Sequence, residues 1–82
     1  MVKVKYRGHL AALTGMAEES LQAADVNAVL EIIRSRYGRK AEKTARAMLI
    51  ALNGKSIQLL KQYKTAIIEG DVLNFFPLSA GG

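Results

Sequence analysis

The chain has 82 residues, which is enough for one domain with a small hydrophobic core. Apolar residues make up 50% of it and charged residues 23%, a globular mixture that excludes an intrinsically disordered chain. There is no cysteine, which excludes a disulfide framework or zinc knuckle and favours a reducing, cytoplasmic setting. Because no run of about 18 apolar residues occurs, we expect neither a membrane span nor secretion.

The net charge is +5, and much of the positive charge is concentrated in the middle of the sequence. The basic residues of this segment are Arg34, Arg36, Arg39, Lys40, Lys43 and Arg46. Such a cluster is compatible with a nucleic-acid or acidic partner. Tyr37 is the single aromatic residue within the run, so bases would have little to stack on. A solvated helix face is therefore the favoured interpretation, and a nucleic-acid partner is disfavoured.

The first 23 residues predict two strands and a connection between them. Apolar and basic residues alternate over residues 2–6, which predicts a strand with one buried face. Residues 8–15 place a helix-like apolar cluster between two glycines, and we expect them to form the connection. Residues 20–23 are then predicted to supply a short partner strand.

The clearest helix is predicted for residues 26–37, where apolar side chains recur at spacings of three and four. Asp25 is positioned to cap the first free amides, and Gly38 stands where a left-handed residue commonly ends a helix. Residues 39–48 are predicted to be a polar connector that includes a short second helix.

The rest of the chain predicts three more strands. Residues 49–52 run into Asn53-Gly54, a strong two-residue hairpin signal, and residues 55–60 are expected to return antiparallel. Glu69-Gly70-Asp71 predicts a tight turn before a last strand that Pro77 ends. The element order predicts an α+β fold, with a mixed four- or five-stranded sheet, one main helix on one face and the other face exposed.

Enzyme motifs are missing from the sequence. His9 has no ligand partner near it and is expected in a loop, so we predict no metal site. The acidic pairs Glu18/Glu19 and Glu69/Asp71 lie near predicted turns, where solvated carboxylates are common. We therefore expect no catalytic side chain in the chain itself.

The tail, residues 78–82, is the segment in which we expect the function to reside. It contains Leu78, Ala80, Gly81 and Gly82, mostly small residues that follow a strand-ending proline. Five extended residues span about 17 Å, enough to carry the carboxylate of Gly82 into another protein's active site. Glycine lacks a Cβ atom, so a narrow channel can close around the backbone beside that carboxylate.

The chain resembles the MoaD/ThiS family of ubiquitin-like sulfur carriers, most closely the small subunit of molybdopterin synthase. The residues that carry the resemblance are Val2-Lys3-Val4-Lys5-Tyr6, Leu13-Thr14-Gly15, the helix from Val26, Ala51-Leu52-Asn53-Gly54, Glu69-Gly70-Asp71, Phe75-Phe76-Pro77 and Gly81-Gly82. Two departures are Arg7, where the family often has an aromatic residue, and Pro77-Leu78, where it usually has two prolines.

The resemblance implies a β-grasp domain at residues 1–77 and a tail at residues 78–82. It also implies that a MoeB/ThiF-like enzyme uses ATP to adenylate Gly82, which then becomes a thiocarboxylate. The sulfur would pass to a pterin precursor within a MoaE-like large subunit of molybdopterin synthase. The chain would bind no cofactor, and its partner interface would include Phe76, Leu78 and Arg7, with Phe76 facing away from core residues.

Other functions remain open on the sequence alone. A ubiquitin-like protein modifier needs the same glycine tail, and the sulfur acceptor of a carrier could be a pterin, a thiazole or a tRNA. A small basic nucleic-acid-binding module is an alternative of a different class, and its affinity would fall steeply with salt. A structural interaction domain with an incidental tail is the remaining alternative.

Overall fold

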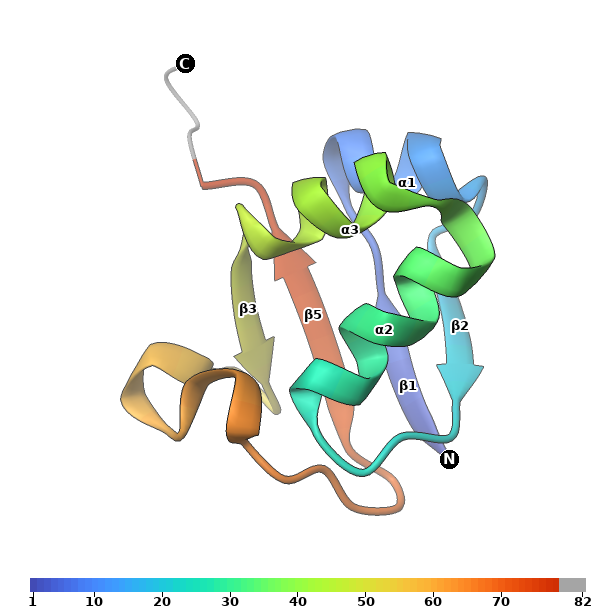
Figure 1. Ribbon diagram of the computed structural model, residues 1–82. Coiled ribbons are helices and arrows are strands. Elements are labelled where there is room, and N and C mark those ends of the chain that lie inside the picture. The colour runs from blue at the N-terminus through green and yellow to red at the C-terminus, as the bar shows by residue number, and fades with distance from the viewer. Residues whose placement is uncertain (79–82) are drawn as a thin grey trace.

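The computed structural model describes residues 1–78, and it has helices on one side of a sheet (Figure 1). The elements, in chain order, are β1 (Val2–Lys5), α1 (Gly8–Thr14), β2 (Glu18–Leu21), α2 (Val26–Tyr37), α3 (Arg39–Arg46), β3 (Leu49–Leu52), β4 (Lys55–Ser56), the 3-10 helices η1 (Ile57–Leu59) and η2 (Gln62–Lys64), and β5 (Val72–Phe76).

The sheet has five strands in the order β2-β1-β5-β3-β4. The central pair β1 and β5 is parallel, and the other pairs are antiparallel. Helix α2 lies across the sheet, while α1 and α3 lie toward the end where β5 finishes (Figure 1). This arrangement confirms the α+β, ubiquitin-like β-grasp prediction with a mixed sheet.

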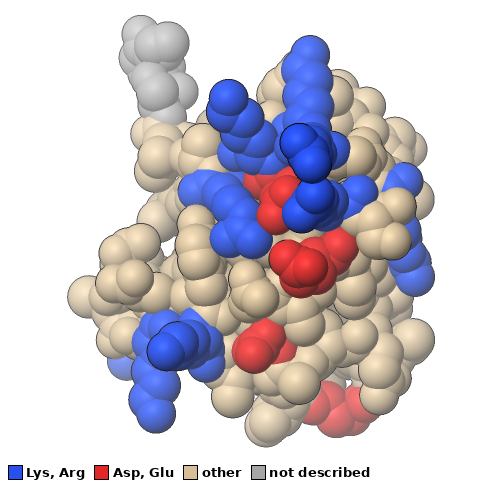
Figure 2. Space-filling model, in the orientation of Figure 1, with Lys and Arg blue, Asp and Glu red and all other residues tan. Residues whose placement is uncertain are grey.

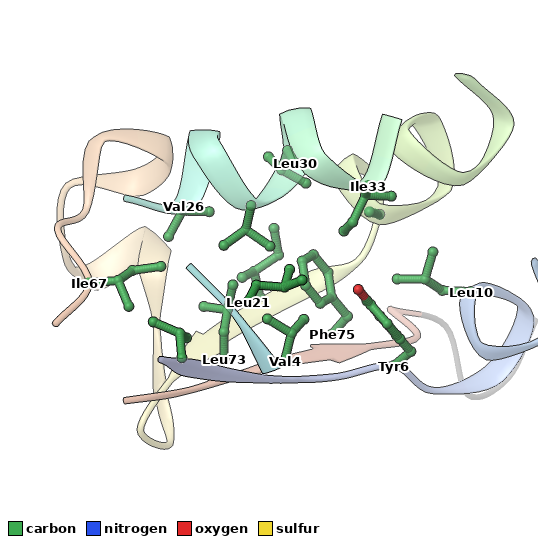
Figure 3. Close-up of a cluster of buried hydrophobic side chains, with 14 of the residues drawn as sticks. Val4, Tyr6, Leu10, Leu21, Val26, Leu30, Ile33, Ile67, Leu73 and Phe75 are labelled. Carbon is green, nitrogen blue, oxygen red and sulfur yellow. The ribbon is translucent and has the colours of Figure 1, made fainter. Parts of the chain in front are cut away.

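The core fills the space between the sheet and α2 (Figure 3). Leu30 and Ile33 of α2 are fully buried above Leu73 and Phe75 of β5, and Val4 of β1 is buried with them. Burial of such side chains contributes roughly 1.5–3 kcal/mol each, so this layer supplies most of the stability of a small domain. The opposite face of the sheet carries no helix among the described residues.

The segment between β1 and β2 is a helix, α1, whereas the sequence predicted a connection and placed His9 in a loop. The helix forms because Leu10 is fully buried against the core and Thr14 is nearly so. Gly15 has a φ of 77° and ends the helix in the left-handed conformation. His9 is exposed on α1, and the two glycines bracket the helix instead of preventing it.

Strand β2 begins two residues earlier than predicted, at Glu18, and ends at Leu21. Its register sets Leu21 opposite Val2 and Glu18 opposite Lys5, which buries Leu21 on the helix-covered face. The predicted segment 20–23 was wrong because a strand starting at residue 20 would leave β1 without partners along half its length.

The main helix begins and ends where the sequence predicted. The Asp25 carboxylate accepts a hydrogen bond from the amide of Ala28 at 2.7 Å, which confirms the N-cap. Gly38 has a positive φ of 95° with an extended ψ of 174°, so the chain turns directly into α3. The expected short second helix is α3, and it is anchored by its fully buried Ala41 and Ala45.

The prediction of a strand over residues 55–60 was wrong beyond Ser56. The Asn53-Gly54 turn is present, with φ values of 51° and 86° that suit the predicted hairpin. After two paired residues the Ser56 hydroxyl accepts a hydrogen bond from the amide of Gln58 at 3.2 Å, which starts η1. Ile57 turns into the core, where it is 2% exposed, so the strand stops early.

No helix within residues 1–78 is both long and apolar enough to cross a bilayer.

Candidate functional site

Strand β5 leads directly into the tail, and its neighbours hold it firmly. It lies between β1 and β3, with Leu73 paired to Val4 and Phe75 paired to Ile50. Leu73 and Phe75 are fully buried, while Phe76 is partly exposed on the open face, as the alternation predicted. The predicted tail residues Ala80, Gly81 and Gly82 lie outside the described residues.

Pro77 is the point where the chain leaves the sheet, and it packs against the start of α1. Gly8 has a φ of 57°, and a Cβ atom added there would lie 3.0 Å from the Cγ atom of Pro77. A side chain at position 8 would therefore meet the proline as well as strain the backbone. The sequence could not show this contact, because the two residues are far apart in the chain.

An apolar patch lies at the root of the tail and consists of Leu49, Phe76 and Leu78. Leu49 of β3 is paired with Phe76 of β5, so the two side chains share the open face. Leu49 is 37% exposed and Leu78 is 68% exposed, whereas the leucines of the core are almost fully buried. This apolar patch suits contact with another protein.

Arg7 covers part of the apolar patch from the neighbouring strand. Its guanidinium carbon lies 5.1 Å from the centroid of the Phe76 ring, within the range of a cation–π interaction. It also donates a long hydrogen bond, 3.5 Å, to the side-chain oxygen of Asn74. The structure thus brings together predicted interface residues Arg7 and Phe76, with Leu78 just beyond them.

A hollow of about 250 Å³ opens beside the apolar patch. Its lining comes from α3, β3, η1, η2 and the tail root, and comprises Arg46, Ala47, Met48, Leu49, Ile50, Ile57, Gln58, Tyr63 and Leu78. The Arg46 guanidinium lies 5.0 Å from the centroid of the Tyr63 ring and closes one wall. No local pattern in the sequence predicts this hollow, because its walls come from separate segments.

Its place near a predicted turn suggested that Glu19 lies in solvent, and this prediction was wrong. Its carboxylate accepts hydrogen bonds from the hydroxyls of Tyr6 at 2.5 Å and Tyr37 at 2.7 Å, and Arg36 pairs with it at 2.9 Å. Burial, followed by the hydrogen bond to Glu19, raises the pKa of both tyrosine hydroxyls above the ordinary value of 10.0. The cluster ties β1, β2 and α2 together, so its role is structural.

In the other acidic pair, Asp71 holds a turn together. Asp71 accepts a hydrogen bond from the amide of Ile68 at 2.8 Å and another from the side chain of Asn53 at 2.9 Å. These two bonds hold the pKa of Asp71 below its usual value. Among residues 1–78, no group of three or more histidine, cysteine or acidic residues could hold a metal ion.

The basic segment of the sequence forms part of the helix-covered side (Figure 2). Acidic side chains lie among the basic ones there. Arg46 donates to Glu42 at 2.9 and 3.1 Å, and Arg34 lies 3.8 Å from the same carboxylate. These pairs fit the interpretation of a solvated helix face.

Comparison with known proteins relates the whole domain and its tail to one family. The model of the ThiS family matches residues 4–82. The fold is shared with a chain of the BexX/CysO complex of Amycolatopsis orientalis, at a TM-score of 0.86 and 20% identity over 100% of both chains.

Two further solved structures are similar at 25% identity. Small archaeal modifier protein 1 of Methanosarcina acetivorans matches with a TM-score of 0.83, and the alignment covers 99% of this chain and 95% of that protein's chain. The putative molybdopterin converting factor, subunit 1, of Pyrococcus furiosus matches with a TM-score of 0.70, and the alignment covers 93% of this chain and 94% of that protein's chain. No curated protein matches this chain in sequence. With the family match spanning nearly its full length, the chain belongs to the ThiS family.

Proposed function

We propose that this protein is a cytoplasmic sulfur carrier that donates sulfur in molybdenum-cofactor synthesis through its terminal glycine, Gly82. The observation that carries the proposal is the family match, which runs through the domain and continues over Gly81 and Gly82. The geometry at the root of the tail supports it, since β5 ends at Phe76, beside an apolar patch on the face that carries no helix within residues 1–78.

The chemistry takes place at the tail carboxylate and needs no side chain of this domain. The carboxylate of Gly82 attacks ATP bound to a MoeB/ThiF-like enzyme, which gives an acyl-adenylate and releases pyrophosphate. A persulfide on a sulfur-donor protein displaces AMP and forms an acyl disulfide. A thiol then cleaves the S–S bond, forming a new disulfide and leaving the thiocarboxylate on Gly82. ATP is consumed by the activating enzyme, so the carrier holds no cofactor.

The described residues serve to present the tail. The parallel and antiparallel neighbours of β5 fix its direction, and the contact between Pro77 and Gly8 fixes where the chain leaves the sheet. Leu49, Phe76 and Leu78 offer the apolar area that a partner covers while the tail is in its active site. A fixed exit point at Pro77 lowers the entropy cost of placing Gly82 against the reacting phosphate.

A MoaE-like large subunit of molybdopterin synthase is the proposed acceptor protein, in which the thiocarboxylate passes its sulfur to the pterin precursor. The similarity to a putative molybdopterin converting factor subunit supports this assignment. The archaeal modifier protein, which has the same 25% sequence identity to this chain, supports a second candidate function, conjugation of Gly82 to lysine side chains. The two functions share the adenylation step and differ in whether sulfur or a lysine amine takes the acyl group.

The test is the intact mass of the chain purified from its native cells under reducing conditions. We expect a species heavier by the difference between one sulfur and one oxygen, located at Gly82 by fragmentation. Deleting Gly82 should abolish it, while the matched control Ser79→Ala should retain it. The same mass shows whether Gly82 is the last residue of the mature chain. A plain carboxylate in every sample, with sulfur and ATP abundant, would refute the carrier function.

The modifier function is tested on the same cells. If it operates, peptides from digested cell extract contain lysines joined by an isopeptide bond to a remnant of the tail. Conjugates that disappear with Gly82 deletion, together with normal cofactor levels in the deletion strain, would favour the modifier. Loss of the cofactor without conjugates favours the carrier.

A further inference from the structure

The open face of the sheet has a basic row that the tail chemistry does not use. Lys3, Lys5 and Arg7 occupy alternate positions along β1 and its continuation, where they alternate with the buried residues Val2, Val4 and Tyr6. Because side chains of a strand alternate between its faces, the three cations point away from the helices. We call Lys3, Lys5 and Arg7 the basic row.

The basic row has little compensating negative charge on its own face. Glu18 is the one acid among the open-face positions of β1, β2, β3 and β5. Its carboxylate lies 3.3 Å from the ammonium of Lys3, and both side chains are about half exposed. Lys5 and Arg7 form no ion pair with any residue of the described segment 1–78. Within the described residues, the polar interactions of Arg7 are with neutral groups, the Phe76 ring and the Asn74 amide.

The helix-covered side presents its charge differently. There Arg36 is paired with Glu19, and Arg34 and Arg46 share the carboxylate of Glu42. These pairs cancel much of the positive potential near α2. On α3, Arg39, Lys40 and Lys43 are exposed and form no ion pair within residues 1–78. Arg7 differs from these cations because it contacts Phe76, the residue that immediately precedes Pro77.

The basic row and the apolar patch together have the layout of a protein interface. Phe76, Leu49 and Leu78 form an apolar centre, and Arg7 joins it to Lys5 at one margin. Interfaces commonly combine an apolar centre with a charged rim, and rim charges accelerate association with a partner of opposite charge. A partner that receives the tail must approach this margin, because the chain leaves the sheet at Pro77, directly after Phe76.

We propose that the adenylating enzyme that receives the tail has carboxylates facing Lys5 and Arg7, and that these steer the carrier into the complex. The inference rests on the proposed function, since it concerns the enzyme that activates Gly82. Its chemistry is specific: the partner surface is acidic beside an apolar area, so salt weakens the attraction. A carrier with an uncharged residue at position 7 would be attracted less strongly to that acidic surface.

The test measures association of the full chain with the ThiF-like adenylating enzyme of the same cells by stopped-flow fluorescence. We expect Lys5→Glu with Arg7→Glu to slow association at low salt by about tenfold or more, and the difference to vanish at high salt. The matched control, Lys40→Glu with Lys43→Glu on α3, removes the same charge from exposed positions and should change the rate much less. Arg7→Lys should keep most of the rate, because it keeps the charge.

The outcomes separate this inference from the proposed function. Equal slowing by both double variants would overturn it, since net charge alone would then explain the effect, and no slowing by either would overturn it as well. The carrier concentration that half-saturates pyrophosphate release from ATP should rise for the Lys5/Arg7 variant at low salt and return toward the wild-type value at high salt, because steering affects the encounter. A wild-type chain that is never adenylated would refute the proposed function itself.

Discussion

Phe75 and Phe76 are neighbours in sequence, yet they belong to opposite faces of the sheet. Phe75 is fully buried beneath α2, whereas Phe76 is partly exposed beneath the guanidinium of Arg7. Glu19 and Glu18 repeat the contrast on β2: the first carboxylate is held by two tyrosines and an arginine, and the second forms a half-exposed pair with Lys3.

Period-two alternation along the strands gives the two faces of this sheet different roles. One face supplies the burial and the hydrogen bonds that stabilise the fold, which leaves the other face free to contact a partner. Substituting neighbouring residues should therefore change two separate measurements, the free energy of unfolding and the affinity for the activating enzyme.

The largest effect is expected for the phenylalanine pair. Phe75→Ala should lower the free energy of unfolding by about 3–5 kcal/mol, because it leaves a cavity at the centre of the core. Phe76→Ala should lower it by less than about 1 kcal/mol and instead weaken binding to the activating enzyme. Urea unfolding followed by circular dichroism, together with a binding titration, measures both. Equal destabilisation by the two variants would contradict the division between the faces.

The glutamate pair should show the same division with a smaller difference. Glu19→Gln removes the charged acceptor of the Tyr6 and Tyr37 hydroxyls and should cost about 1–3 kcal/mol. Glu18→Gln breaks an exposed pair with Lys3 and should cost about 0–1 kcal/mol. Thermal and urea unfolding of both variants at neutral pH check this. A Glu18 variant that is the less stable of the two would show that the cluster around Glu19 adds little.

The tyrosines of that cluster predict how stability changes in alkali. The pKa of Tyr6 is raised in the folded state, so the unfolded chain loses this proton first as the pH rises above 10. The free energy of unfolding should then fall by about 1.4 kcal/mol per pH unit for this one group. Tyr6→Phe should remove that part of the slope, while Tyr63→Phe is the control for general alkaline effects. An unchanged slope in the Tyr6 variant would mean that other groups cause it.

Much of this fold could be predicted from the sequence because its signals are local. Alternation specifies β1 and β5, the three- and four-residue spacing specifies α2, and Asn53-Gly54 specifies the hairpin. Helix α1 was missed because its seven residues depend on the burial of Leu10 by distant segments, and a short helix has little stability of its own.

The site was predictable to a smaller extent. The open-face position of Phe76 follows from alternation, but its contact with Arg7 depends on the parallel pairing of β1 with β5. The burial of Glu19 likewise depends on partners from β1 and α2, so its neighbours in sequence suggested a solvated side chain. Residues gathered by tertiary pairing leave no local pattern, and this explains why the hollow beside Leu78 was not expected.

The sharpest separation of fold from function is expected at the two glycines that bound α1. Gly8 and Gly15 both have positive φ, so alanine at either position should cost about 1 kcal/mol or somewhat more. A Cβ atom at position 15 would meet nothing within 4 Å, whereas one at position 8 would press on Pro77. Gly8→Ala should therefore also redirect the tail and slow adenylation of Gly82 several-fold, at a stability close to that of Gly15→Ala. Pyrophosphate release at equal occupancy of the activating enzyme measures the difference, and matching rates for the two variants would mean that the contact with Pro77 does not position the tail.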